Sequence, residues 1–369
     1  CAVKNTALIL ISLIVFGAFA GAGCQATPPE PAQPAPEAIV TVEDFQGQVA
    51  KTGQTDAVPM IVDTDMAPDD WMAILYLLMR PDVDVRAITV AGTGEAHCEP
   101  GVRHAMNLAA LAGWPQIPVA CGRDTPLAGN HAFPGPWRSR ADTLAGLELS
   151  ANPATASDQD AVAVLTDTLR SSPKPVTVVT LGPLTNLAEA LQADPALAGQ
   201  IEGVDVMGGA FEVPGNVGLS GVGIDNTAAE WNLYVDPRAA ALVLQSGAPI
   251  TFVPLDATNQ TPITPAFYDR LAANRTTPAA EFVYRVLTTQ LSLIRNGLYW
   301  FWDPLTAVIS SDEHVGKAVE RQVSVVEQEG STVGATRITH DGAPARVVTS
   351  VDATRFTELF LDTLNGRLR

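Results

Sequence analysis

Four aspartates lie within eight residues, from Asp63 to Asp70, where an apolar β-branched stretch gives way to a helical pattern. Asp63 and Asp65 are two apart on the expected strand, so their side chains point to the same side and their like charges need neutralising. A hard cation such as calcium, which binds carboxylate and carbonyl oxygens, would neutralise them. The alternative is that Asp69 and Asp70 complement a helix N-terminus, which accounts for only two of the four acids. The cluster therefore favours a metal site.

Strand and helix patterns alternate along the chain around these acids, which predicts βαβ units. We expect an α/β fold with an open, mostly parallel sheet and helices on both faces, forming a single large domain. In such sheets ligands bind outside the carboxyl ends of the strands, which is where the aspartates stand. The expected strands are 58–65, 83–92, 118–122, 175–182, 203–209 and 249–256, and the expected helices are 69–79, 100–113, 160–169, 184–192 and 237–245.

The segment VDTDMAPDD resembles the aspartate-rich start of the nucleoside hydrolases, a family of calcium-dependent N-ribohydrolases with an open α/β fold. Three further stretches agree with the family in the same order: TLGPLTNLAEAL, then VMGGAFEVPGN with AEWNLYVDP, and finally FWDPLTAVI. Together the four motifs extend across residues 58–309, and their order is more specific than any one motif. The resemblance implies hydrolysis of the N-glycosidic bond of a ribonucleoside to free base and ribose.

By position, the resemblance implies that calcium is bound by Asp65, Asp70, Asp303 and the backbone carbonyl of Leu181, with the ribose diol and a water completing its shell. Asp65 would also be the base that takes a proton from the calcium-bound water, since a cation lowers the pKa of its water. Asp63 would orient these ligands without binding the cation itself. The residues implied to hold the ribose hydroxyls are Asp69, Asn216, Glu230 and Asn232.

Several of these positions also have a purely structural interpretation. Asn216 follows Pro-Gly and fits a turn, and Asp303 stands before a proline and fits a helix cap. Glu230 and Asn232 flank a tryptophan on what could be a solvated edge. An insert at 217–229, longer than in compact family members, separates Asn216 from Glu230, so the role of Asn216 depends on how this loop folds.

One departure from the family pattern follows the second expected strand, where the chain reads AGTGEAHCEPG in place of a usual asparagine. Gly94, Glu95 or His97 must occupy that place. A purine-preferring member of the family carries an acid there, which favours Glu95 as a substrate contact. His97 also fits a surface loop.

A second departure is Trp302, which stands before Asp303 where many members have a histidine that protonates the leaving base. Trp137, in FPGPWR, resembles a second tryptophan of the purine-preferring members. Two indoles stacked on a base would ease protonation of a purine ring, which predicts a preference for purine over pyrimidine nucleosides. The alternative is that both tryptophans are ordinary buried or rim aromatics.

The first 43 residues predict export. A 16-residue apolar run follows Lys4, which is short for a membrane span and typical of a secretory signal. The small residues before Cys24 resemble a bacterial lipoprotein signal, with ordinary signal cleavage or an uncleaved anchor as alternatives. We expect a signal peptide at 1–23, a Pro/Ala-rich tether at 24–43 and a hydrolase domain at 44–369. The enzyme would be lipid-anchored through Cys24, facing the periplasm or the cell surface, and otherwise secreted.

The composition limits the other functional classes. A net charge of −18 without a Lys/Arg cluster argues against nucleic-acid binding, and the four cysteines lack zinc-site spacing. Cys98 and Cys121 could form a disulfide, which the sequence leaves open. Related enzymes are often homo-oligomers, although no helix shows a heptad seam. The rival functions are a non-catalytic nucleoside-binding lipoprotein that feeds a transporter and a phosphatase with a strand-DxD start, in which TLGPLTN and AEWN have no place.

Overall fold

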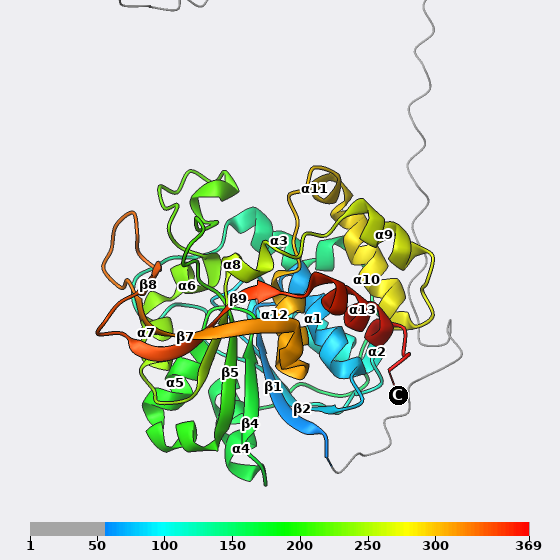
Figure 1. The fold of residues 1–369 in the computed structure, drawn as a ribbon. Helices are drawn as coiled ribbons and strands as arrows, with labels where there is room; N and C mark the ends of the chain where they lie inside the picture. Colours follow the sequence, from blue (N-terminus) through cyan, green and yellow to red (C-terminus); the bar gives the residue numbers. More distant parts are fainter. Residues whose placement is uncertain (1–55, 369) are drawn as a thin grey trace, which may run out of the picture. The chain divides into compact units, whose positions relative to one another are not determined.

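The computed structural model describes residues 56–368, and nine strands within them form one sheet in the order β3-β2-β1-β4-β5-β6-β9-β7-β8 (Figure 1). Strands from β3 to β9 pair in parallel, whereas β7 is antiparallel to β9 and β8 to β7. The strands are β1 (Val58–Thr64), β2 (Val83–Val90), β3 (Val119–Cys121), β4 (Val176–Thr180), β5 (Ile201–Met207), β6 (Ile250–Val253), β7 (Gly316–Val325), β8 (Thr336–Ile338) and β9 (Ala343–Val351).

Helices cover both faces of this sheet because the central strands are mainly apolar along their length, and successive side chains of a strand point to opposite faces. On β1, Met60 and Val62 pack into a core with α1, α10, α12 and α13, while Ile61 packs on the opposite side with α4, α5 and α7. The helices are α1 (Pro68–Met79), α2 (Cys98–Leu111), α3 (Gly135–Asp142), α4 (Ala161–Ser171), α5 (Thr185–Ala193), α6 (Trp231–Val235), α7 (Pro237–Leu244), α8 (Leu255–Thr258), α9 (Pro265–Ala272), α10 (Pro278–Thr289), α11 (Leu291–Arg295), α12 (Trp302–Ser311) and α13 (Ala353–Leu364).

The predicted α/β class with a mostly parallel open sheet is confirmed. The sequence patterns did not identify the antiparallel extension β9-β7-β8. In β7 only Val323 is fully buried, so this strand lacks the continuous apolar run that marks the central strands.

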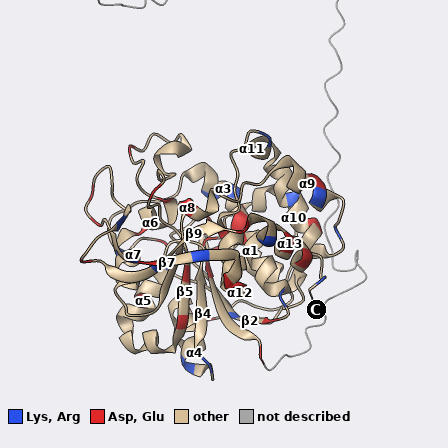
Figure 2. Cartoon of the chain, viewed as in Figure 1, with Lys and Arg blue, Asp and Glu red and all other residues tan. Residues whose placement is uncertain are grey.

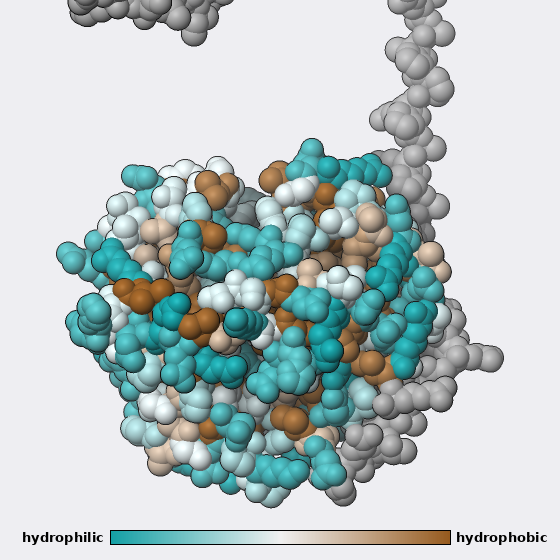
Figure 3. Space-filling model, viewed as in Figure 1, coloured by the Kyte–Doolittle hydropathy of each residue, from teal (hydrophilic) through white to brown (hydrophobic). Residues whose placement is uncertain are grey.

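The face of the molecule shown in Figure 3 is mainly hydrophilic, with hydrophobic residues in small separate spots.

The order of the strands reverses between β1 and β4, because the chain builds β1-β2-β3 in one direction and β4-β5-β6 in the other. This switch point lies at the carboxyl ends of β1 and β4. In doubly wound sheets ligands bind in the crevice at such a point. The aspartate cluster after β1 and Leu181 after β4 both lie at this place.

The predicted signal peptide (1–23), the whole predicted tether (24–43) and the predicted start of the hydrolase domain at residue 44 lie outside the described residues. Within residues 56–368, no helix is both long and apolar enough to span a bilayer.

Candidate active site

The Asp65 side chain lies between the backbones of two loops at the crevice. A Cβ atom placed on Gly94 would come 2.0 Å from the Asp65 Cβ, and one placed on Gly182 would come 2.5 Å from it. The carbonyl of Asp65 accepts a hydrogen bond from the Ala96 N–H (2.9 Å), and its carboxylate accepts one from the Ala67 N–H (3.2 Å). Glycine at positions 94 and 182 is therefore what allows Asp65 to sit here.

Met66, next to Asp65, has a φ of 62°, which is a strained backbone conformation for a non-glycine residue. Its side chain is fully buried, and its carbonyl accepts a hydrogen bond from the Trp71 indole (2.8 Å). Such strain persists only where the surroundings enforce it, and it turns the chain from β1 into α1 directly beside the aspartates.

Three carboxylates, Asp69, Asp70 and Asp303, bring oxygens within 4.8 Å of one another. Asp69 and Asp70 stand in the first turn of α1, and Asp303 stands in the first turn of α12. Asp70 is fully buried and accepts hydrogen bonds from the Thr64 hydroxyl, the Asp65 N–H (3.1 Å) and the Ala67 N–H (3.1 Å). Asp65 lies next to this group, because its N–H donates to the Asp70 carboxylate. Asp69, which was predicted to hold the ribose, belongs to the group.

Burial and mutual repulsion disfavour the charged forms of these acids. Burial raises the pKa of Asp69 to about 7, with the Asp70 charge adding to the effect. The pKa values of Asp65 and Asp303 are raised well above the usual value, first by burial and then by the charge of Asp70. Behind them, burial raises the pKa of Asp63 to about 7, although the Thr89 hydroxyl (2.6 Å) and the Asn186 amide (2.8 Å) donate to it.

These acids fit a divalent cation. The Asp303 Oδ1 atom is buried without a hydrogen-bond partner, which is costly for a carboxylate oxygen unless a cation binds it. An all-oxygen donor set of carboxylates suits a hard cation such as calcium. The alternative that Asp303 caps a helix is wrong, because Phe301 occupies the N-cap position of α12 and no side-chain cap bond is made.

The Leu181 carbonyl, predicted as a ligand, accepts a hydrogen bond from the Asn232 side-chain amide (2.9 Å). A carbonyl has two lone pairs, so one remains for a cation. The same amide also donates to the Met207 carbonyl (3.2 Å). Asn232 thus ties the end of β4 to the end of β5.

Glu230 is the N-cap of α6, and its carboxylate accepts hydrogen bonds from the N–H groups of Asn232 (2.9 Å), Leu233 (3.3 Å) and Gly209 (3.3 Å). Burial nevertheless raises its pKa to about 7. The alternative that Glu230 and Asn232 lie on a solvated edge is wrong, because both are buried.

Asn216 is half-buried, and its side-chain oxygen accepts a hydrogen bond from the Trp231 N–H (3.1 Å). The insert after it folds back on itself, since Gly215 N–H donates to the Thr227 carbonyl (2.8 Å) and Gly218 N–H to the Asn226 carbonyl (2.6 Å). Asn216 is thereby held at the start of α6, beside Glu230. Contact with the ribose stays a prediction for all three polar residues of this corner.

Among the three residues considered after β2, Glu95 is the one whose charge interacts with the carboxylates. Burial raises the pKa of Glu95 to about 8, and the charges of Asp69 and Asp70 add to the effect. His97 is exposed and its Nδ1 pairs with the Asp142 carboxylate (2.7 Å). The exposure of His97 fits its interpretation as a surface residue. Contact of Glu95 with the substrate stays a prediction.

The pairing of Cys98 and Cys121 that the sequence left open is a disulfide. It joins the first residue of α2 to the last residue of β3. The loop that carries Gly94 and Glu95 runs directly into Cys98, so the disulfide fixes one end of this wall of the site.

Trp137 and Trp302 lie in different aromatic groups. Trp137, on α3, contacts the Trp231 ring (centroids 5.3 Å apart), which in turn stacks on Phe133. Trp302, at the start of α12, contacts the Tyr299 ring (5.4 Å). Both tryptophans are half-buried, and stacking on a base stays a prediction.

The sequence analysis missed Tyr299 and Asn186. The Tyr299 hydroxyl is buried without a hydrogen-bond partner, and its pKa is raised above 10 by burial and by the charges of Asp69 and Glu95. Asn186 binds Asp63 and closely faces Gly122, where a Cβ would come 1.9 Å from its Oδ1 atom. Both residues stand inside the recognised motifs or next to them, but nothing in the sequence says which side chains face the acids.

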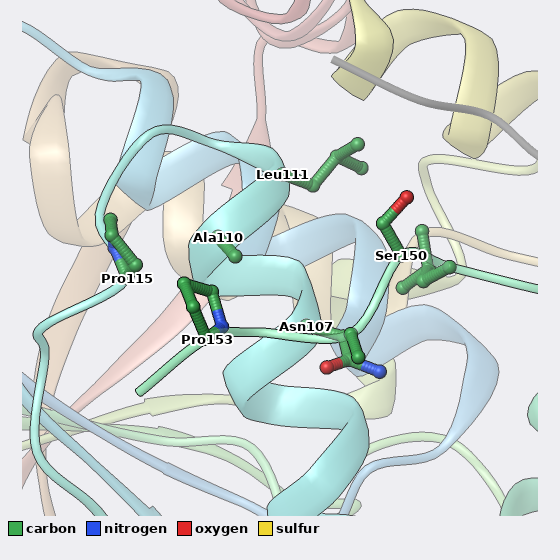
Figure 4. Close-up of a pocket in the computed structure, with 8 residues that line it drawn as sticks. Asn107, Ala110, Leu111, Pro115, Ser150 and Pro153 are labelled. Carbon is green, nitrogen blue, oxygen red and sulfur yellow. The ribbon is translucent and has the colours of Figure 1, made fainter. Parts of the chain in front are cut away.

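A separate hollow lies between α2 and the segment 149–153 (Figure 4). Its lining is mainly apolar and includes none of the site acids. It therefore has no part in the chemistry described above.

Comparison with known proteins places this chain among the nucleoside hydrolases. Residues 60–358 match the family described as inosine-uridine preferring nucleoside hydrolase. A pyrimidine-specific ribonucleoside hydrolase, RihA of Escherichia coli O127:H6, is 33% identical over 324 residues, which cover 84% of this chain and 98% of the relative.

Two solved structures are similar in fold. The inosine-uridine preferring nucleoside hydrolase of Bacillus anthracis matches with a TM-score of 0.74 at 25% identity, covering 84% of this chain and 99% of that one. The purine-preferring ribonucleoside hydrolase of Gardnerella vaginalis matches with a TM-score of 0.71 at 27% identity, covering 84% and 98%. These matches show that the chain belongs to the inosine-uridine preferring nucleoside hydrolase family.

Proposed function

We propose that this nucleoside hydrolase is a calcium-dependent enzyme that prefers purine ribonucleosides. The observation that carries calcium dependence is the buried group of Asp69, Asp70 and Asp303 with the partnerless Asp303 Oδ1 atom. Asp65, Asp70, Asp303 and the Leu181 carbonyl would hold the cation, and Asp69 would bind a ribose hydroxyl beside it. Bound calcium supplies a positive charge that orients the ribose and makes water easier to deprotonate.

Asp65 is the proposed base. Its carboxylate is fixed by the Ala67 N–H and by the two glycine walls, so it can accept the proton of the attacking water without reorganising. The water oxygen forms a bond to the anomeric carbon of the ribose while the N-glycosidic bond breaks. The electron pair of the broken bond leaves with the nucleobase. Replacing Asp65 by Asn is expected to lower kcat by at least about 100-fold while changing substrate affinity much less, as for loss of a general base.

The preference for purines is supported by Trp302, which stands directly before Asp303, and by Trp137 on α3. A departing purine can take up a proton on its imidazole ring, and stacking on indole rings would favour that protonated form. The specificity of the Escherichia coli relative favours a second candidate, a pyrimidine-preferring enzyme.

A panel of inosine, adenosine, guanosine, uridine and cytidine separates the two candidates, with release of reducing sugar as the measurement. We expect Trp302→Ala to lower kcat for inosine by at least tenfold, which is about 1.4 kcal/mol of barrier. Trp114→Phe, which alters a half-buried tryptophan at the end of α2, is the control. Uridine hydrolysis as fast as inosine hydrolysis by the unmutated enzyme refutes the purine preference.

Calcium dependence is tested by chelation and by adding calcium back. The expected result is loss of activity with chelator and recovery with calcium. Full activity after exhaustive chelation contradicts the proposal.

We further propose that the enzyme is exported and held to a membrane by lipid on Cys24. The support is the apolar run, the small residues before Cys24 and the Pro/Ala-rich tether. Stable attachment requires two or more acyl chains. Replacing Cys24 by Ser is expected to move the full-length protein from the membrane to the soluble fraction, and an unchanged membrane fraction contradicts the anchor.

A further inference from the structure

Helix α3 lies toward the carboxyl ends of the central strands (Figure 1), and a hydrogen bond joins it to the last residue of α10. It carries two arginines, which are drawn in blue in Figure 2. Arg138 donates to the Gly92 carbonyl (2.9 Å), and the Asp142 carboxylate accepts from the His97 N–H (2.8 Å). These contacts hold α3 against the loop that carries Glu95.

Arg140, between them in sequence, points to the other side. Its Nη2 donates to both the carbonyl and the hydroxyl oxygen of Thr289, each at 3.1 Å. Thr289 is the last residue of α10, and the chain from there leads through α11 to Tyr299 and Asp303. Arg140 therefore links two stretches of chain that approach the site separately.

The positive charge of Arg140 also acts inside the site. It lowers the pKa of Glu95 and of Tyr299, against the larger effect of burial. Asp69 acts on the same two groups in the opposite sense.

We propose that Arg140 is a positioning residue of this enzyme: its two hydrogen bonds to Thr289 join α3, and with it the Glu95 loop, to the end of α10. Its role is to set the separation of the two walls between which the substrate binds. This inference rests on the proposed function. It concerns substrate binding rather than the acids that carry the chemistry.

The test is steady-state kinetics of Arg140→Met, which keeps most of the side-chain length and removes both hydrogen bonds and the charge. We expect KM for the preferred nucleoside to rise at least about tenfold, with kcat within about threefold, because loss of uniform binding acts on KM alone. Thr289→Val, which removes only the hydroxyl acceptor, should give a smaller rise in KM. Arg140→Lys should recover part of the loss because it restores the charge.

The matched control is Arg103→Met, which removes an exposed arginine that pairs with Glu99 on α2. We expect this variant to have wild-type KM and kcat. A merely structural role for Arg140 would lower Tm, and would reduce kcat in proportion to the unfolded fraction without changing KM. That outcome, or wild-type KM in Arg140→Met, overturns the inference.

A binding experiment keeps this inference separate from the proposed function. Quenching of tryptophan fluorescence by ribose and by hypoxanthine, titrated separately, measures binding without turnover. Arg140→Met should weaken at least one of them, while calcium affinity measured by calorimetry stays unchanged because Arg140 contacts none of the acids within hydrogen-bond range in the described chain. Inactive wild-type enzyme refutes the proposed function, whereas equal binding of both ligands by wild type and variant refutes the role of Arg140.

Discussion

Gly94→Ala is a direct test of how tightly the site encloses Asp65. The added Cβ would lie 2.0 Å from the Asp65 Cβ and 2.9 Å from its Cγ, whereas ordinary contacts begin at 3.4 Å. One side must therefore move by about 1.4 Å, the difference between 3.4 Å and 2.0 Å. Asp65 cannot retreat, because Gly182 closes in from the other side and the Ala96 N–H holds the Asp65 carbonyl.

This displacement reaches the carboxylate that we propose as the catalytic base. A misplacement of about 1 Å can cost roughly 100-fold in rate, so we expect kcat of Gly94→Ala to fall by at least that factor. Calcium affinity should also weaken, since Asp65 is a proposed ligand. Overpacking of this kind destabilises a fold by about 1–3 kcal/mol, which the Tm of the variant will report.

The control is Gly199→Ala in the 3-10 helix Pro195–Gln200, where an added Cβ meets no atom within 4 Å. The φ angle is not positive at either glycine, so alanine adds no backbone strain at either position. The two variants therefore differ only in the steric contacts of the added Cβ atom. We expect Gly199→Ala to have wild-type kinetics and equal or slightly higher stability. A Gly94→Ala enzyme with kcat and calcium affinity within about threefold of wild type would falsify the reasoning, because a 100-fold loss follows from displacement on this scale.

Three further predictions concern the acids, the disulfide and the cap of α6. Burial raises the pKa of Asp63 and Asp69 from 3.8 to about 7, so the folded protein retains protons that the unfolded chain has released. The Tm of chelated protein should therefore fall as pH rises from about 4 to 7, and excess calcium should reduce this fall; a pH-independent Tm contradicts the raised pKa values. Replacing both Cys98 and Cys121 by Ser releases a loop closed over a sequence separation of 23, which should cost roughly 3 kcal/mol by loop entropy in denaturant unfolding; unchanged stability argues against the bond. Glu230→Ala removes the acceptor of three backbone N–H groups and should cost about 1–2 kcal/mol, with Glu230→Gln losing less; equal stability of the two variants contradicts the capping role.

Much of the fold was predictable because its signals are local. The strands from β1 to β6 are short, buried and flanked by helical periodicity, and these patterns are fixed by neighbours a few residues apart. The strands β7, β8 and β9 escaped prediction because they are partly exposed and lack such a pattern. The place of β7 and β8 at the sheet edge depends on pairing with β9, which no short window of sequence contains.

The sequence by itself determined the α/β class. It also determined the acids at the end of β1, since four carboxylates lie within the eight residues from Asp63 to Asp70. The resemblance of its motifs added Asp303. Only the tertiary structure showed that the Asp303 Oδ1 atom is left without a partner, that Cys98 reaches Cys121, and that Arg140 on α3 bonds to Thr289 at the end of α10. These features depend on the packing of elements far apart in the chain, and periodicity, which reports only which face of an element is buried, carries no information about which distant side chain lies opposite.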